Sequence, residues 1–259
     1  MNQDLDNYLI DKYPYIFRDR YASMRETAMC WGFACGDGWF DLIDVLCELC
    51  TRYLETRPEL AKEFFAVQVK EKFGTLRFYV SKGTDYLFAL AEAAEDLSEY
   101  VCEECGAPGT ICRPNGHWIQ CRCPEHGGPP LKPLVPPSVR VAIDQWGDEY
   151  VDLHPGPHAD PKSLADLETY LQRRPEMRPL IPVFARAYET FPGVAWLLQA
   201  ILQILGLTGT LKDHPDFALE IRDVRGDPVF EISGTIDDEL RGTFDFYSAF
   251  LKRWREKNL

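Results

Sequence analysis

Two closely spaced pairs of metal-binding side chains constrain the fold of this chain more than any other feature. Cys102 and Cys105 are followed, seventeen residues later, by Cys123 and His126, which gives the pattern C-x2-C-x17-C-x2-H. This spacing fits one tetrahedral zinc ion, because each pair can reach the metal from a tight turn. Four protein ligands leave no open position for water, so the pattern predicts a structural zinc site.

The segment between the two pairs has the composition of a turn-rich loop. Its helix-breaking residues, which permit sharp reversals of the chain, are Gly106, Pro108, Gly109, Pro114, Asn115 and Gly116. Cys112 and Cys121 also lie here and are spare cysteines. Cys121 can replace Cys123 as a ligand, but four residues then separate it from His126, so the tighter Cys123–His126 pair is preferred.

Four cysteines precede this region, at positions Cys30, Cys35, Cys47 and Cys50. Cys47 and Cys50 lie one helical turn apart, so a second metal site is one interpretation. The aromatic and glycine-rich surroundings favour the other interpretation, in which these cysteines are small buried apolar residues. All nine cysteines precede residue 124 and the N-terminus does not resemble a signal peptide, which is typical of a reducing compartment.

The sequence predicts an α+β protein with two domains. Residues 128–137 are rich in proline and glycine, so they lack the donors for a sheet and predict a semi-rigid linker. The first domain is then residues 1–127, closed by the zinc loop, and the second is residues 138–259. The cysteine-free composition of the second half supports a boundary at this place.

Hydrophobic periodicity predicts the elements of each domain. The first domain has the order α-β-β-α, with elements at 39–56, 65–72, 75–81 and 84–101. The second has two strands, three helices, a hairpin and a final helix. These lie at 139–143, 150–153, 163–173, 180–190, 195–205, 217–224 with 229–233, and from 238 or 244 to 257. No run approaches the roughly 20 apolar residues of a membrane span, so we expect no membrane association.

The chain is acidic, with a formal net charge of −13. Both predicted domains share this excess of acidic residues, which repels a phosphate backbone and disfavours general nucleic-acid binding. Acidic surfaces instead suit a basic partner, although a solvated helix face is an equally simple interpretation. The candidate partner-binding residues follow one face of the helix at 84–101 and continue into the zinc loop: Glu92, Glu95, Asp96, Glu99 and Glu103.

Recognisable catalytic motifs are missing from the sequence. No Walker-type lysine motif, nucleophile elbow, H-E-x-x-H or G-x-G-x-x-G occurs. The turn at Gly36–Gly38 can bind an anion, but Asp37 opposes one and is more simply a helix-capping residue. The loop at Asp152–Asp160, with His154 and His158, is a conceivable hydrolytic metal cluster, but a flexible loop positions ligands poorly.

Several motifs in residues 13–127 resemble a family of short phage- and prophage-encoded proteins. They are YPYIF at Tyr13–Phe17, CWGFACGDGW at Cys30–Trp39, VKEKFGTLRFY at Val69–Tyr79, and the zinc-loop cysteines with Trp118. The resemblance supports zinc ligation by Cys102, Cys105, Cys123 and His126, and implies that the chain acts in a bacterial host cytoplasm. It implies no particular activity.

We therefore expect a non-enzymatic protein that binds and inhibits a host protein, such as a basic, nucleic-acid-binding component of a CRISPR-type or restriction defence. One alternative is a zinc-dependent nucleic-acid-binding regulator, whose contacts would come from the zinc loop: Arg113, His117, Trp118 and Arg122. A second alternative is a hydrolase centred on Asp152–Asp160. The sequence leaves the partner, the oligomeric state and the domain that carries specificity open.

Overall fold

The computed structural model describes residues 1–114, 116, 118–127, 140–143, 149–152, 176–177, 179–208 and 210–259. Its helices and small sheets confirm the α+β class. The chain divides into two compact units, of which the first comprises Met1–Gly128 together with Asp237–Leu259. The second unit comprises Pro129–Ile236, so it is an insertion between two parts of the first.

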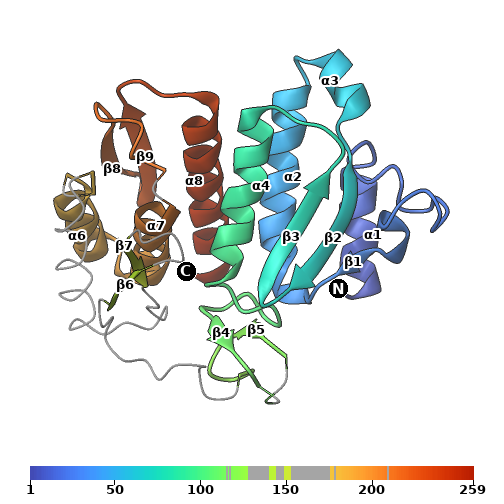
Figure 1. The fold of residues 1–259 in the computed structure, drawn as a ribbon, viewed down its shortest axis with the longest axis horizontal. Helices are drawn as coiled ribbons and strands as arrows, with labels where there is room; N and C mark the ends of the chain where they lie inside the picture. The colour runs from blue at the N-terminus through green and yellow to red at the C-terminus, as the bar shows by residue number, and fades with distance from the viewer. Residues whose placement is uncertain are drawn as a thin grey trace. The chain divides into compact units, whose positions relative to one another are not determined.

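The C-terminal helix corrects the predicted domain division. The sequence assigned residues 138–259 to one domain, but helix α8 (Asp238–Asn258) belongs to the first unit. It packs against α4 (Asp85–Ser98) and α2 (Phe40–Leu54), as Figure 1 shows. An apolar stripe shows that a helix needs a partner surface, but it does not identify that surface. The predicted linker at 128–137 lies outside the described residues.

Helix α8 buries several large apolar side chains. They are Leu240, Phe244, Phe246, Tyr247, Phe250 and Leu251. Gly242 is needed where the two helices meet, because a Cβ atom there would lie 2.6 Å from the backbone oxygen of Tyr86 in α4. The glycine therefore allows a close approach that any larger residue would prevent.

A buried carboxylate fixes the other end of α8. Asp44 of α2 accepts hydrogen bonds from Lys12 (2.7 Å) and from the hydroxyl of Tyr13 (2.8 Å), and it forms an ion pair with Arg253 of α8. Burial opposes ionisation of Asp44, but these three partners outweigh it and lower the pKa of the carboxyl group. The same network holds α1 (Gln3–Lys12) to α2. Helix α1 was not predicted from the sequence.

The first unit contains a three-stranded sheet in the order β1-β2-β3. Strand β1 (Phe33–Ala34) is parallel to β2 (Ala66–Lys72), which pairs antiparallel with β3 (Thr75–Val80). Helix α2 lies behind the β2–β3 hairpin in Figure 1, and α3 (Pro58–Glu63) precedes β2. Side chains of one face, including Val69, Leu76 and Phe78, are buried in the core of this unit. Short 3-10 helices cover Met29–Trp31 and Asp37–Trp39.

The hairpin between β2 and β3 turns through only two residues. Phe73 and Gly74 have φ values of 57° and 85°, which is the geometry of a type I′ turn. Such a turn matches the right-handed twist of the strands, and the predicted hairpin is confirmed. A bulky residue is uncommon at a positive φ, whereas Asn, Asp and Gly are favoured there.

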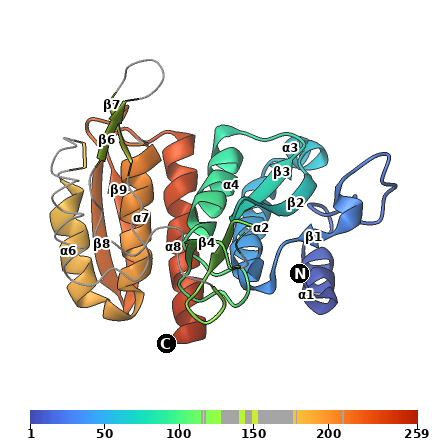
Figure 2. The same ribbon diagram turned by 60° about the horizontal axis from the view of Figure 1, so that its bottom comes forward.

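The described part of the second unit, residues 140–143, 149–152, 176–177, 179–208 and 210–236, contains two helices and two short hairpins. Its elements are β6 (Arg140–Ile143), β7 (Glu149–Asp152), α6 (Leu180–Thr190), a 3-10 helix (Pro192–Val194), α7 (Ala195–Thr208), β8 (Ala218–Val224) and β9 (Asp227–Ser233). Figure 2 shows α6 and α7 beside the β8–β9 hairpin, whose two-residue turn is Arg225–Gly226. The predicted helix at 163–173 lies outside the described residues.

Candidate metal centre

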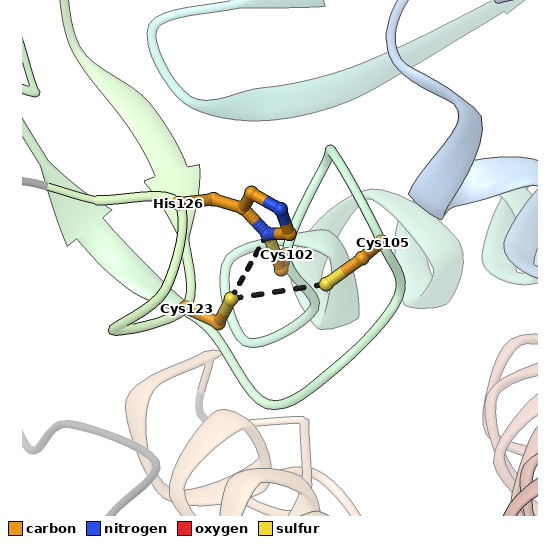
Figure 3. A group of neighbouring side chains, drawn as sticks. All are labelled: Cys102, Cys105, Cys123 and His126. Atoms are coloured by element: carbon orange, nitrogen blue, oxygen red, sulfur yellow. Dashed lines mark hydrogen bonds between the residues drawn. The ribbon is translucent and has the colours of Figure 1, made fainter.

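The structure brings the four predicted metal ligands together. Cys102 and Cys105 come from the turn that follows α4, and Cys123 and His126 follow strand β5 (Gln120–Arg122). Figure 3 shows the four side chains around one point, and their ligand atoms all lie within 4.8 Å of one another. The Sγ atoms of Cys105 and Cys123 are 3.7 Å apart, and the Sγ of Cys123 is 3.2 Å from Nδ1 of His126.

These distances suit a tetrahedral ion. Zinc–sulfur bonds of about 2.3 Å at tetrahedral angles place two sulfur ligands about 3.7 Å apart. The remaining contact, from Cys102 Sγ to Nδ1 of His126, is 3.8 Å. Burial opposes ionisation of Cys123, but the N–H groups of His126 and Glu125 lower the pKa of its thiol. A thiolate is the metal-binding form, so the cluster has the donors and spacing for a metal ion.

A short hairpin completes the module around this cluster. Strand β4 (Thr110–Cys112) pairs antiparallel with β5, and Val101 pairs with Pro108 across the first cysteine turn. The N–H of Glu103 donates to the oxygen of Cys121, at 3.0 Å, so the first cysteine turn is hydrogen-bonded to the strand that precedes Cys123. The metal module is defined here as residues 101–127. Its backbone bonds bring the two ligand pairs together.

The segment Gly36–Trp39 forms the surface on which the metal module sits. The N–H of Gly38 donates to the backbone oxygen of Glu103 at 2.8 Å. The indole N–H of Trp39 donates to the backbone oxygen of Val101 at 2.8 Å. The Glu103 carboxylate accepts from the N–H of Gly36 at 3.0 Å and pairs with Arg122. The motif around Gly36 and Gly38 therefore has a packing role, which the sequence did not reveal.

Asp37 neither caps a helix with its side chain nor faces an anion. Its carboxylate accepts hydrogen bonds from the backbone N–H and the side-chain amide of Asn2, at 2.6 Å and 2.7 Å. The 3-10 helix that begins at Asp37 has no side-chain cap. The predicted capping role is therefore wrong, and Asp37 instead holds the segment that leads into α1.

We expect Gly38→Ala to destabilise the first unit by about 3 kcal/mol or more. A Cβ atom at Gly38 would lie 2.2 Å from the oxygen of Cys102 and 2.6 Å from the nitrogen of Cys105, and backbone atoms cannot move aside easily. Urea denaturation measures the change. Gly116→Ala is the control, because its Cβ meets nothing within 4 Å and only its φ of 76° is unfavourable, at about 1 kcal/mol. Equal losses in the two variants would contradict the close packing at Gly38.

The remaining cysteines form no second metal cluster among the described residues. Cys35, Cys47 and Cys50 are buried, and burial raises the pKa of each thiol, to about 12 for Cys35. Cys121 is also buried and donates to the oxygen of Glu99 at 3.1 Å, so it is not a ligand. Of the four cysteines interpreted as small core residues, Cys35, Cys47 and Cys50 confirm that interpretation. Cys30 is half-buried and donates to the oxygen of Thr27.

The predicted acidic face is not one continuous exposed stripe. Glu103 is only 6% exposed and is bonded inside the metal module. Glu95 accepts from the N–H of Phe78 at 2.7 Å and pairs with Arg77, so it caps the free edge of β3. Glu92 and Glu99 are exposed, and Asp96 is half-buried. Glu95 and Glu103 are therefore engaged within the first unit, which reduces the predicted acidic face to Glu92, Asp96 and Glu99.

Asp96 should make the protein more stable when it is protonated. Burial, and then the negative charges of Glu99, Glu92 and Glu95, raise the pKa of Asp96 to about 7. Its pKa in the unfolded chain is about 3.9. The folded state therefore holds a proton that the unfolded state releases, and this contribution to stability is lost as pH rises from about 4 to 7.

We expect Asp96→Asn to raise the free energy of unfolding at pH 8 by about 2 kcal/mol, because water screens part of the effect at this half-buried site. At pH 4 the variant and the wild type should be equally stable. Thermal melts between pH 4 and 8 test this, with exposed Glu55→Gln as the control. An unchanged pH dependence in Asp96→Asn would contradict the raised pKa.

The other predicted functional residues are only partly covered by the described residues. Arg122 has only 11% of its side chain exposed and pairs with Glu103 and Glu104, so it is not free to contact a nucleic acid. Trp118 is 76% exposed, whereas His117 lies outside the described residues. His154, His158 and Asp160 of the predicted hydrolytic loop also lie outside them, and Asp152 ends strand β7.

One pocket of about 330 Å³ lies in the first unit, between the end of α1, the end of α2 and α3. Its lining is largely apolar and includes Ile16, Leu54 and Phe64. The cation in this lining, Lys12, is bonded to Asp44. The lining contains no histidine or cysteine, so it offers no thiol nucleophile, and its carboxylate is that of Glu55.

Comparisons of the chain with protein-family models, with curated proteins and with solved structures found no match. Within the part of the chain that the structure describes, no helix has the length and apolar character needed to cross a bilayer.

Proposed function

We propose that the cluster binds one zinc ion and that this ion is structural. Three thiolates and one imidazole are the donors of many structural zinc sites, and four protein ligands leave no place for a reacting water. The module backbone packs against Gly36–Trp39, so the ion would stabilise the fold and not act on a substrate. Metal analysis of the purified protein should give one zinc per chain.

We propose further that the protein works by binding another protein through a surface beside the metal module. Two large exposed aromatic residues carry this proposal: Phe73 is 67% exposed and Trp118 is 76% exposed. A Cβ atom at Gly74 would lie 2.8 Å from Ile111 and 3.2 Å from Ile119, so the β2–β3 turn contacts the β4–β5 hairpin. Phe73 immediately precedes Gly74, and Trp118 immediately precedes Ile119, so both aromatic residues border this contact.

Such residues are typical anchors of protein interfaces, where a few aromatic side chains supply most of the binding energy. Phe73 adopts a φ of 57°, which costs a non-glycine residue about 1 kcal/mol. An exposed phenylalanine at this position contributes no core packing that offsets the cost. A binding role gives a reason for both features.

The phage-like motifs favour a host protein as the partner. By binding it, the protein would inhibit a defence complex without catalysing a reaction. The correction of the acidic face changes the expected surface. The partner would contact the aromatic residues beside the metal, and not the residues Glu92, Glu95, Asp96, Glu99 and Glu103.

The test is affinity capture from a host lysate, treated with nuclease, using the double variant Phe73→Asn with Trp118→Ala. We expect the wild type to retain one stoichiometric partner and the double variant to lose it. Phe73→Asn should also stabilise the hairpin by about 0.5–1 kcal/mol, since asparagine tolerates this backbone conformation.

The matched control is Tyr15→Ala with Tyr21→Ala, which removes two aromatic residues that are 78% and 76% exposed elsewhere on the first unit. This control should retain the partner. Capture of the same partner by the Phe73/Trp118 variant would reject the proposed surface. Loss of every partner after nuclease treatment would instead indicate nucleic-acid binding.

A further inference from the structure

The outward face of the β2–β3 hairpin carries positive charge in an otherwise acidic protein. In the strand register, Lys70 lies opposite Arg77 and Gln68 lies opposite Tyr79. Side chains alternate between the faces of a strand, so these four residues and Lys72 share the face opposite to Val69 and Phe78. We call these five residues the basic face: Gln68, Lys70, Lys72, Arg77 and Tyr79.

The cations of the basic face are only partly neutralised. Arg77 pairs with Glu95 at 3.4 Å. No ion pair of Lys70 or Lys72 occurs among the described residues, and their ammonium groups instead lie 5.6 Å from the ring centres of Tyr79 and Phe73. Like charges directly opposite each other on two strands are unfavourable, by some tenths of a kcal/mol. The placement of Lys70 opposite Arg77 therefore does not stabilise the folded protein.

An acidic ligand would remove this repulsion. Lys70 and Lys72 are two residues apart on one strand, so their side chains repeat at about 6.6–6.8 Å. An extended peptide presents every second side chain at the same interval, and carboxylates at that spacing can meet both lysines. Apolar side chains at other positions on the same face of the peptide can then contact Tyr79, which is 39% exposed, and Phe73.

A nucleic acid fits this face less well. The net charge of −13 repels a polyphosphate chain at long range. In addition, each aromatic ring already has a lysine over it, which leaves less of the ring for a base to stack on. An acidic peptide carries fewer charges and needs only local pairing.

We propose that the basic face binds an extended acidic segment of the partner protein. This inference rests on the proposed function, because it assigns the chemistry of the partner at the surface that Phe73 borders. It predicts a partner region in which every second residue is acidic or aromatic, so that both kinds of side chain lie on one face of the extended segment.

The experiment measures fluorescence anisotropy of the full-length protein with a labelled decapeptide in which every second residue is Glu or Tyr and the other residues are Ser. The comparison probes are the same peptide with Lys in place of Glu and a ten-nucleotide oligo-dT. We expect the Glu/Tyr peptide to bind at least about tenfold more tightly than either, and added salt to weaken it. Lack of binding by the Glu/Tyr peptide, or tighter binding of oligo-dT, would overturn the proposal.

Charge reversal identifies the surface. Lys70→Glu with Lys72→Glu should weaken binding of the Glu/Tyr peptide by about tenfold or more, corresponding to at least 1.4 kcal/mol. Lys212→Glu with Lys252→Glu changes the net charge equally at two exposed positions and should leave binding within about threefold. Equal weakening in the two variants would mean that net charge, and not this face, controls binding.

Stability separates a binding role from a structural one. Lys70→Glu places a carboxylate opposite Arg77, so this single variant should be at least as stable as the wild type while binding the peptide more weakly. A less stable variant with unchanged binding would overturn the inference.

The capture experiment distinguishes this inference from the proposed function. A partner that is lost with the Phe73/Trp118 variant but retained by Lys70→Glu with Lys72→Glu would leave the proposed function intact and overturn the basic face. Absence of any partner for the wild type would count against the proposed function itself.

Discussion

Cys105→Ser should release the metal and destabilise the first unit by more than about 4 kcal/mol at micromolar free zinc. A ligand that binds only the folded state stabilises it by an amount that grows with its affinity, and structural zinc sites bind with apparent free energies of about 10–16 kcal/mol. Cys105 is exposed, so its replacement creates no core cavity and the loss reports the metal alone.

Metal content and thermal melting measure this effect, and a strong chelator added to the wild type should reproduce it. Hydrogen exchange should show the loss first in residues 101–127 and in Gly36–Trp39, because these segments hydrogen-bond to each other. Cys30→Ser is the control, since Cys30 is half-buried and outside the cluster. Equal zinc content and equal melting in Cys105→Ser and the wild type would refute a metal role.

Removal of α8 should unfold the first unit. Its aromatic residues Phe246 and Phe250 are almost fully buried against this unit, and Arg253 neutralises the buried carboxylate of Asp44. A chain that ends at Ile236 exposes that apolar surface and leaves Asp44 with one cation fewer. Breaking a buried pair from one side costs about 3–5 kcal/mol, in addition to the lost apolar burial. Circular dichroism and solubility of the truncated chain measure the outcome.

A graded version of this prediction uses single residues. Phe250→Ala should cost about 3–5 kcal/mol, whereas Phe88→Ala, at a position that is 42% exposed on α4, should cost about 1 kcal/mol. Equal costs would show that α8 does not contribute to this core.

The insertion can be tested by rebuilding the first unit without the second. Residues 1–127 alone should remain unfolded, while the same residues joined to 237–259 by a Gly/Ser linker of about 20 residues, with a mean span of about 25 Å, should fold. Folding of residues 1–127 alone would restore the simpler division that the sequence suggested.

Local patterns predicted the local elements well. The stripe of apolar residues in α2, including Leu42, Leu46 and Leu49, repeats at helical spacing, and each of these is buried. The β2–β3 and β8–β9 hairpins were predicted from alternating strands around a glycine turn. These features depend on neighbours in the chain, so a single sequence contains the information for them.

Contacts between distant segments were not predicted. Glu103 lies four positions after Glu99, at the interval that predicts a shared exposed face, yet its carboxylate is buried against Gly36 and Arg122. The two-residue strand β1 is too short to show a pattern, and its parallel partner is thirty-six positions away in the register Phe33–Val69. The presence of glycines among the cysteines indicated close packing at Gly36 and Gly38. It did not identify the segment that packs against them.

The sequence by itself determined the candidate metal ligands, because Cys102, Cys105, Cys123 and His126 form two short-range pairs joined by a turn-rich loop. Only the tertiary structure decided what surrounds that cluster. It placed α8 in the first unit, brought Gly36–Trp39 beneath the cysteine turn and left Phe73 and Trp118 exposed beside it. Short-range ligand spacing is set by the geometry of one turn, whereas these long-range contacts depend on which apolar surfaces best cover one another.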